Sequence, residues 1–363
     1  MYKFKEIEHL HMEISSLCQA SCPMCARNYH GGLPNPKLPE KNLRLDFFKT
    51  ALTSNFLKQL KTITMSGNYG DPIMNNDLID MVRYAAEQNP DIIIYIYTNG
   101  SARSIKWWTE LANEMPKNHL VFFGIDGLAD THSLYRIGTD FNTIIRNAKT
   151  FIDNGGKAQW NFITFQHNQH QLDECRKLAE ELGFVRFQEK QTTRFVGSNE
   201  FKVLDKTGTE IYKLSTPVES KIEFIDKDTI KNYKSLFDTA IISCEAEREK
   251  RIYIDAQGRL WPSFFIGSVL YQYSPPDDLV YDFVNDSISS LISTIKEFGG
   301  LEGLDLKNKS IEEIVDSKEW QTVWNASFEN KSILMCVRVC GKFAENKISQ
   351  PQQELLDLKE FNV

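Results

Sequence analysis

The chain has 363 residues, of which 41% are apolar and 25% charged, a composition typical of a soluble globular protein with two domains. Its formal net charge is −7 and its Lys and Arg residues are scattered, so a nucleic-acid backbone is excluded as the main partner. No run of about 18 apolar residues occurs and the N-terminus lacks a signal-peptide core, so we expect no membrane association and a cytoplasmic location.

The first informative segment is a strand-like run followed by three cysteines. Cys18, Cys22 and Cys25 are spaced C-x3-C-x2-C. Three thiolates within eight residues can converge on one soft metal centre, whereas a structural zinc site usually takes its four ligands as two separated pairs. A 4Fe–4S cluster held by three cysteines would leave one iron free to bind another molecule. The seven cysteines of the chain therefore suit metal binding in a reducing compartment better than a disulfide framework.

Residues 11–190 alternate between strand-like and helical segments. Apolar residues at i, i+3, i+4 and i+7 predict amphipathic helices over residues 78–86, 107–115, 141–152 and 172–182. Six β/α units in series predict a parallel sheet, curved or open. The strands are expected near His11–Ser15, Thr62–Ser66, Ile92–Tyr97, Leu120–Ile125, Gln159–Phe165 and Phe184–Gln188.

Polar and glycine-rich residues follow four consecutive strands. The first strand runs into Cys18, and the second ends in Ser66-Gly67-Asn68-Tyr69-Gly70-Asp71-Pro72. The third ends in Thr98-Asn99-Gly100 and the fourth in Asp126-Gly127. Each of these segments alone is compatible with simple turn chemistry. In parallel β/α folds, however, functional groups collect at the C-terminal ends of the strands, so the set predicts one functional rim.

The cysteine spacing after an N-terminal strand resembles the cluster motif of the radical S-adenosylmethionine (SAM) superfamily. The resemblance implies an α/β fold with a partial six-unit β/α, TIM-like barrel over residues 1–195. In that superfamily the free iron of the 4Fe–4S cluster chelates the amino and carboxylate groups of SAM. An electron, supplied by a donor such as flavodoxin or ferredoxin, cleaves SAM, and the resulting 5′-deoxyadenosyl radical abstracts hydrogen from the substrate.

The same resemblance implies SAM-binding roles for residues at the strand ends. Tyr69-Gly70-Asp71-Pro72 resembles the family's Gly-Gly-Glu-Pro element, whose backbone and acid meet the methionyl ammonium; here the acid is shorter. Thr98-Asn99 resembles the segment beside the ribose, and Asp126 resembles the acid near the substrate cavity. Met24 stands where the family usually has an aromatic residue near adenine, and a polarisable methionine can pack there too.

The character of the sequence changes after residue 195. Residues 196–240 read as a connecting segment with a hairpin over Phe201–Val218. Residues 241–345 form the second expected domain, which begins near Cys244 and contains a hairpin around Ala256-Gln257-Gly258. This domain also holds Cys336 and Cys340. The remaining residues, 346–363, are expected to form a polar tail.

The second domain is similar to the twitch domain, a shortened form of the SPASM extension of some radical SAM enzymes. That pattern has a cysteine, a hairpin with a glycine, and a second cysteine five residues beyond the glycine; here Ser263 takes that place after Gly258. The resemblance implies a small α+β domain with an auxiliary 4Fe–4S cluster on Cys244, Cys336 and Cys340. The fourth position is then the oxygen of Ser263, another group, or an open iron. The alternative is that these cysteines bind zinc, or nothing.

These features favour a radical SAM enzyme of the oxidoreductase type, acting on an unidentified small molecule or peptide. Some relatives with a twitch domain are dehydrogenases, in which the auxiliary cluster takes the second electron. One alternative is a peptide or protein maturase of the SPASM type. Only 17 residues precede Cys18, so a stand-alone partner would have to supply the peptide-binding module. Another alternative is a non-catalytic iron–sulfur or zinc protein that carries electrons or acts as a scaffold.

Overall fold

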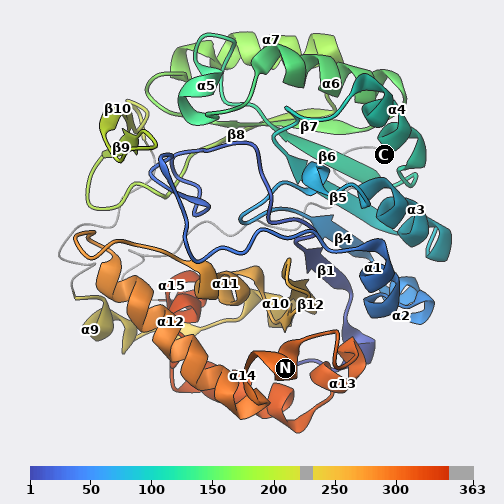
Figure 1. The fold of residues 1–363 in the computed structure, drawn as a ribbon, viewed down its shortest axis with the longest axis vertical. Coiled ribbons are helices and arrows are strands. Elements are labelled where there is room, and N and C mark those ends of the chain that lie inside the picture. The colour runs from blue at the N-terminus through green and yellow to red at the C-terminus, as the bar shows by residue number, and fades with distance from the viewer. Residues whose placement is uncertain (221–231, 343–363) are drawn as a thin grey trace.

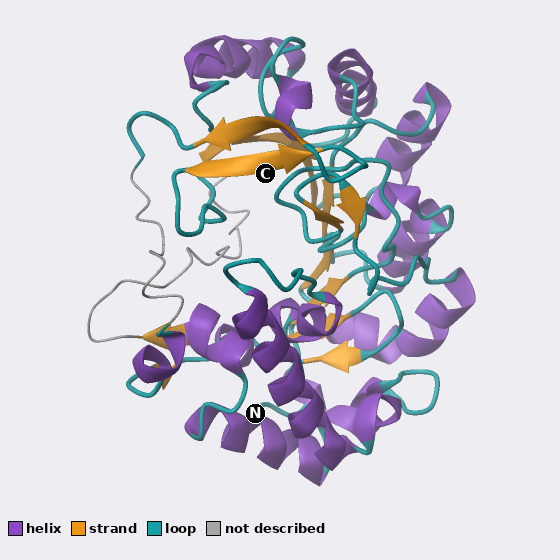
Figure 2. Cartoon of the chain, turned by 60° about the vertical axis from the view of Figure 1, so that its left-hand side comes forward, coloured by secondary structure: helices purple, strands orange, loops and turns teal. Residues whose placement is uncertain are grey.

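The centre of the molecule is a curved eight-stranded sheet (Figures 1 and 2). The computed structural model describes residues 1–220 and 232–342, so the expected tail at 346–363 lies outside the described residues. All neighbouring strands of this sheet are parallel except β12 and β13, the antiparallel pair at one edge. In spatial order the strands are β13 (Leu260–Trp261), β12 (Arg251–Ile254), β1 (His9–Met12), β4 (Thr62–Met65), β5 (Ile93–Thr98), β6 (His119–Gly124), β7 (Ala158–Ile163) and β8 (Arg186–Lys190).

The helices of the first region cover the outer face of this sheet (Figure 1). Their apolar stripes pack on the strands, and β6 is buried along its whole length, as expected for a strand covered on both faces. The six β/α units confirm the expected partial barrel. The helices are α1 (Leu45–Ala51), α2 (Ser54–Gln59), α3 (Leu78–Gln88), α4 (Ile105–Glu114), α5 (His132–Tyr135), α6 (Phe141–Asp153) and α7 (Leu172–Leu182).

Local signals in the sequence explain where these helices begin and end. The Asp140 side chain accepts a hydrogen bond from the Thr143 amide at 2.7 Å and caps the start of α6. Ser104 caps α4 in the same way through the Trp107 amide. Helix α7 ends at Gly183, whose φ of 84° places it in the left-handed region that glycine adopts without strain. These caps fix the lengths of the connections that return the chain to the next strand.

The strand register brings the ends of β1, β4, β5 and β6 to one rim. Met12 pairs with Met65, which in turn pairs with Ile96, so β1, β4 and β5 are aligned side by side. Thr98 at the end of β5 pairs with Phe123 near the end of β6. The loops that follow these four strands therefore leave the sheet at the same edge, as the sequence predicts.

The second region is mainly helical and lies below the barrel in Figure 1. The connecting segment contains the expected hairpin, β9 (Glu200–Leu204) and β10 (Glu210–Ser215). The second region has one further small antiparallel pair, β11 (Ile241–Ile242) with β14 (Gly341–Lys342). Another such pair, β2 (Asn28–Tyr29) with β3 (Leu33–Pro34), belongs to the first region. The helices are α9 (Tyr233–Phe237), α10 (Glu245–Arg248), α11 (Phe264–Gly267), α12 (Tyr281–Ile295), α13 (Ile311–Val315), α14 (Lys318–Glu329) and α15 (Leu334–Cys340). Across the described ranges, none of the helices combines the length and the hydropathy that a bilayer span requires.

The hairpin of the second region forms part of the barrel sheet. Strand β12 pairs in parallel with β1, in the register His9 to Arg251 and Met12 to Ile254. The N-terminal residues continue this association, because the Gln321 side chain donates a hydrogen bond to the Tyr2 carbonyl at 2.9 Å. Sequence reasoning placed this hairpin in a separate domain, since strand patterns do not reveal which distant strand will cover an open sheet edge. The two regions share one sheet.

Candidate functional site

Cys18, Cys22 and Cys25 lie together in the loop that follows β1. A turn closed by the Cys25 amide and the Cys22 carbonyl, 3.0 Å apart, links the second and third cysteines. Burial raises the pKa of Cys18, and the Asp71, Cys22 and Cys25 side chains nearby raise it further. Two N–H groups point at the Cys18 sulfur, the Ala20 amide at 3.4 Å and the Asn99 side chain at 3.6 Å. Such donors stabilise a thiolate.

The spacing of the three sulfurs bears on what they could bind. In the part of the chain that the structure describes, no three Cys, His, Asp or Glu side chains surround one ion position. Each cysteine of a 4Fe–4S cluster binds a different iron, so the sulfurs of a cluster site stand further apart than the ligands of one metal ion. The loop provides three half-buried thiols that influence one another, and three cysteine ligands are the set that the predicted cluster requires.

Asp71 connects the ends of β4 and β5. One carboxylate oxygen accepts hydrogen bonds from the Thr98 hydroxyl at 3.0 Å and the Asn99 amide at 2.7 Å, and the other accepts from the Ile73 amide at 3.1 Å. Burial raises the pKa of Asp71, while these donors lower it. Asp71 thus positions Asn99, which in turn donates to Cys18. A direct contact of the acid with SAM stays a prediction.

Gly70 is required by the close approach of two backbone segments. A Cβ atom at this position would lie 2.0 Å from the Ser15 carbonyl oxygen, so no other residue fits without moving the chain. The neighbouring Tyr69 is buried, and its hydroxyl donates to the Ser268 carbonyl at 2.5 Å. The expected SAM-binding loop is therefore pressed against the cysteine loop on one side and anchored to the second region on the other.

Glu13 accepts hydrogen bonds from the same loop, which follows β4. One oxygen of its buried carboxylate accepts hydrogen bonds from the Tyr69 and Gly70 amides, at 2.8 and 3.1 Å. The other oxygen accepts from the Tyr253 hydroxyl of β12 at 2.7 Å. Burial raises the pKa of Glu13 to about 7, although these three donors lower it. The carboxyl therefore joins the loop after β4 to the second region.

Asp126 lies at the end of β6 in an ion pair with Arg136. The Arg136 Nε donates to one Asp126 oxygen at 2.5 Å, and the Ile163 amide donates to the other at 2.6 Å. Burial raises the pKa of Cys22 to about 11, and the neighbouring Arg136 guanidinium opposes that rise. Asp126 thus places a cation beside a cysteine of the loop. The structure does not test its expected role near a substrate.

Met24 packs in a small apolar cluster beside the cysteine loop. Its buried side chain belongs to a group with Tyr135, Phe165 and Phe195, and its carbonyl accepts a hydrogen bond from Arg194 at 2.8 Å. The residues of this group come from α5 and from the segments that follow β7 and β8. Met24 therefore lies on an apolar wall at the rim, and packing against adenine remains its predicted role.

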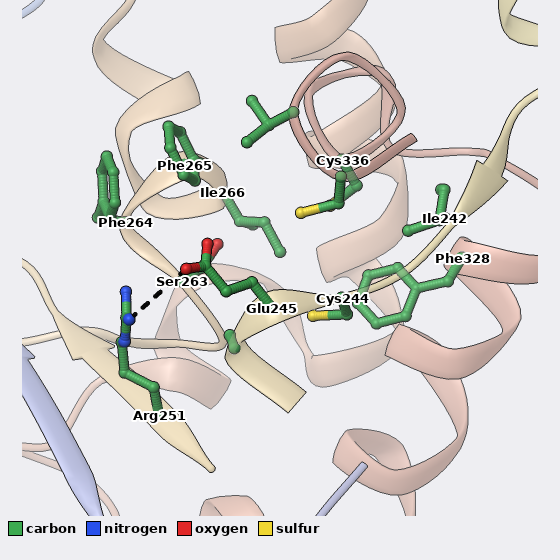
Figure 3. A pocket seen from close by; sticks show the side chains of 13 residues that line it. Ile242, Cys244, Glu245, Arg251, Ser263, Phe264, Phe265, Ile266, Phe328 and Cys336 are labelled. Atoms are coloured by element: carbon green, nitrogen blue, oxygen red, sulfur yellow. Dashed lines mark ion pairs between the residues drawn. The ribbon is translucent and has the colours of Figure 1, made fainter. Parts of the chain in front are cut away.

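The second set of cysteines lines one cavity in the second region. Cys244, Cys336 and Cys340 border it together with Ser263 (Figure 3). Burial and the Cys340 thiol raise the pKa of Cys244 to about 12, while backbone N–H groups of Glu247 and Ala246 donate to it and lower it. Burial also raises the pKa of Cys336, with contributions from Cys244 and Cys340. Residues at the starts of α10 and α11 and residues of α15 thus border one cavity, and a cluster bound there stays a prediction.

The family of the chain follows from its sequence match. Residues 12–197, more than half of the chain, match the model of the radical SAM superfamily. The chain belongs to the radical SAM superfamily. Membership implies a radical SAM enzyme with a 4Fe–4S cluster and SAM as cofactors, and it confirms the resemblance seen in the cysteine loop. A comparison with curated proteins gave no match.

Several solved structures of radical SAM proteins are similar in fold. Streptococcus suis SuiB bound to S-adenosylmethionine is 15% identical, with a TM-score of 0.49 over 77% of this chain, which spans 65% of the SuiB chain. The protein anSMEcpe with bound AdoMet is 14% identical, with a TM-score of 0.47 and coverage of 91% and 95% of the two chains. BtrN in complex with AdoMet and 2-DOIA is 11% identical, with a TM-score of 0.45 and coverage of 96% and 98%.

Sequence reasoning missed two residues of this radical SAM site. Arg136 lies nine residues after Asp126-Gly127, the predicted strand end, and its position downstream of that segment is the only signal in the sequence for a role at the site. Glu13 precedes the cysteine motif and reads as an ordinary polar residue after a strand. Its importance arises from a contact with Tyr253, far away in the sequence, which no local pattern reveals.

Replacing Glu13 by glutamine should remove a pH-dependent part of the stability. The pKa is about 7 in the folded chain against 4.5 ordinarily, so the folded state binds the proton more tightly than the unfolded state. This contribution is complete below about pH 4.5 and is lost as the pH rises through about 7. The difference between these two pKa values corresponds to about 3 kcal/mol. Urea unfolding should show that, between about pH 5 and about pH 8, the free energy of unfolding of the wild type falls by about 3 kcal/mol more than that of E13Q. An equal difference between the two proteins at both pH values would refute this contribution of Glu13.

Proposed function

We propose that this protein cleaves SAM reductively at a cluster on Cys18, Cys22 and Cys25, and oxidises its substrate with the help of a second cluster. The observation that carries the proposal is the cavity of the second region, where Cys244, Cys336 and Cys340 gather beside Ser263. Bound together, the cluster and SAM supply a 5′-deoxyadenosyl radical that abstracts hydrogen. The substrate is a small molecule or a peptide, and flavodoxin or ferredoxin is a suitable electron donor.

The residues around the first site fit a cluster with one open iron. Three thiols are available, and the N–H groups of Ala20 and Asn99 point at the sulfur of Cys18. Arg136 adds a positive charge beside Cys22, which offsets part of the negative charge of three thiolates and any anionic ligand. The ligands offered to the metal are therefore soft thiolates, and the groups around them are hydrogen-bond donors and a cation, a combination that suits an iron–sulfur cluster.

The strand ends are suited to hold SAM against that cluster. We assign this role to the loop from Tyr69 to Asp71, to Thr98 and Asn99, and to Met24 and Asp126. Asp71 acts by fixing the positions of Thr98 and Asn99, because both its oxygens are engaged in hydrogen bonds. Glu13 keeps the loop rigid through two backbone amides. Positioning of this kind reduces the entropic cost of orienting the reactants.

The second site fits an electron-accepting cluster. Its three thiols are buried or half-buried, and the N–H groups of Ala246 and Glu247 donate to Cys244. An amide of Glu245 similarly donates to Cys340. Hydrogen bonds to sulfur and exclusion of water are two of the means by which a protein sets the potential of a cluster. A cluster held by these residues would supply a one-electron acceptor for the substrate radical, so that hydrogen abstraction, transfer of that electron and loss of a proton to solvent together make a two-electron oxidation.

Iron analysis of a variant without the first site tests this proposal. In C18A/C22A/C25A protein, reconstituted without oxygen, about four irons and about four sulfides per chain should remain on the second site. Adding C244A/C336A/C340A should remove them. The wild type should hold about eight irons. If the first variant retains essentially no iron, or if zinc fills the second site, the auxiliary cluster does not exist and the proposed oxidation loses its electron acceptor.

A further inference from the structure

The cavity of the second region is also lined by a carboxylate, Glu245, which the cysteine pattern does not predict. Glu245 follows Cys244 directly, at the start of α10, and lines the same cavity (Figure 3). Its side chain is only 9% exposed. Its backbone N–H donates to the Cys340 sulfur, and its carboxylate raises the pKa of that thiol. Glu245 is therefore adjacent to Cys244 in the chain and hydrogen-bonded to Cys340 through its backbone.

The Glu245 carboxylate is only partly compensated. It pairs with the Arg251 guanidinium at 3.9 Å, and that guanidinium is also paired with Glu249. It also shares a hydrogen bond with the Glu249 carboxyl group. An ionised carboxylate has room for about four such partners, and a buried one is costly when few of them are present. The group has spare acceptor capacity in a cavity that offers sulfur ligands but lacks a fourth cysteine among its lining residues.

We propose that Glu245 is the fourth protein ligand of the auxiliary cluster, an assignment that rests on the proposed function. Three cysteines leave one iron of the cluster without a protein ligand, and a carboxylate is a suitable ligand for iron. Ser263 borders the same cavity, but its hydroxyl must lose a proton of high pKa before it becomes an anionic ligand. Glu245 borders the cavity with a carboxylate, which can offer iron either of two oxygens, whereas Ser263 offers a single hydroxyl oxygen.

The test uses the C18A/C22A/C25A protein, in which any cluster belongs to the second site. Glu245→Gln removes the anionic ligand with little change of shape. Glu249→Gln is the matched control, because Glu249 also contacts Arg251 and does not line the cavity. Each protein is reconstituted without oxygen, oxidised mildly with ferricyanide, and examined for iron content and by electron paramagnetic resonance. We expect E245Q to lose one of about four irons and show a three-iron cluster signal, while the parent and E249Q keep four.

The other outcomes separate the ligand from its alternatives. Retention of four irons by E245Q overturns the assignment, and so does an equal loss in E249Q, which would indicate a general effect of buried charge. Loss of one iron in S263A but not in E245Q would make the serine the ligand. A parent protein that binds no iron refutes the second cluster itself. Misfolding of E245Q is detected in the chain with all seven cysteines, where the first site should still hold about four irons.

Discussion

Replacing Cys22 by alanine should abolish the formation of 5′-deoxyadenosine from SAM. Cys22 lies close to both Cys25 and Arg136, and its loss leaves only two thiols at the first site. Removing even an outer-shell partner of a metal site costs about ten- to a hundredfold in activity, so loss of a ligand should exceed about a hundredfold. The measurement is the amount of 5′-deoxyadenosine formed with SAM and dithionite, together with iron content, which should fall by about half.

Cys175 provides the matched control for this substitution. It is a buried cysteine on α7, packed in the main core and remote from the cysteine loop in sequence. Cys175→Ala removes one sulfur and should leave both the iron content and SAM cleavage unchanged, at a modest cost in stability. If C22A still cleaves SAM at a rate comparable with C175A, the first cluster is not held by this loop.

Replacing Gly70 by alanine should both destabilise the chain and weaken SAM binding. The new Cβ would lie 2.0 Å from the Ser15 oxygen and 2.7 Å from the Ser16 Cα, and both are backbone atoms that cannot move cheaply. Relieving the overlap must separate the loop after β4 from the cysteine loop. Overpacking of this kind typically costs about 1–3 kcal/mol, and we expect the upper end here. Urea unfolding measures the stability, and equilibrium binding of SAM to the reconstituted protein measures the functional effect.

Gly155 separates steric overlap from ordinary glycine strain. Its φ is 90°, and an added Cβ would meet nothing within 4 Å. Gly155→Ala therefore carries only the backbone cost of the left-handed region, about 1–2 kcal/mol, and should bind SAM like the wild type. A G70A protein that binds SAM as well as G155A does would show that the approach of the two loops is not needed for the site.

The main features of the barrel were predictable from the sequence. Strand-like runs located the six strands, and helix stripes located α3, α4, α6 and α7, because both patterns depend on residues close together in the chain. Strand limits shifted by one to three residues; the first strand, for example, covers His9–Met12 where His11–Ser15 was expected. The helices α1 and α2 were not predicted, since each is short and has few buried apolar positions.

What the sequence did not reveal depends on contacts between distant residues. Strand β12 joins β1 because a sheet edge was available, and nothing in Arg251–Ile254 specifies that partner. The link from Glu13 to Tyr253, and the position of Arg136 beside Cys22, arise only after folding. Asp71 illustrates the opposite case, since a motif predicted its place at the rim but not that its oxygens are occupied by Thr98 and Asn99.

The pairing of β1 with β12 has a consequence for synthesis of the chain on the ribosome. Strand β1 lies between β4 and β12, so one of its two edges can be covered only when Arg251–Ile254 have been translated. Until then the N-terminal barrel carries an exposed parallel edge directly before the cysteine loop, and open edges favour pairing with other chains. The interval between translation of His9–Met12 and of β12 is thus the stage at which the nascent chain is most exposed to aggregation and to premature oxidation of its thiols.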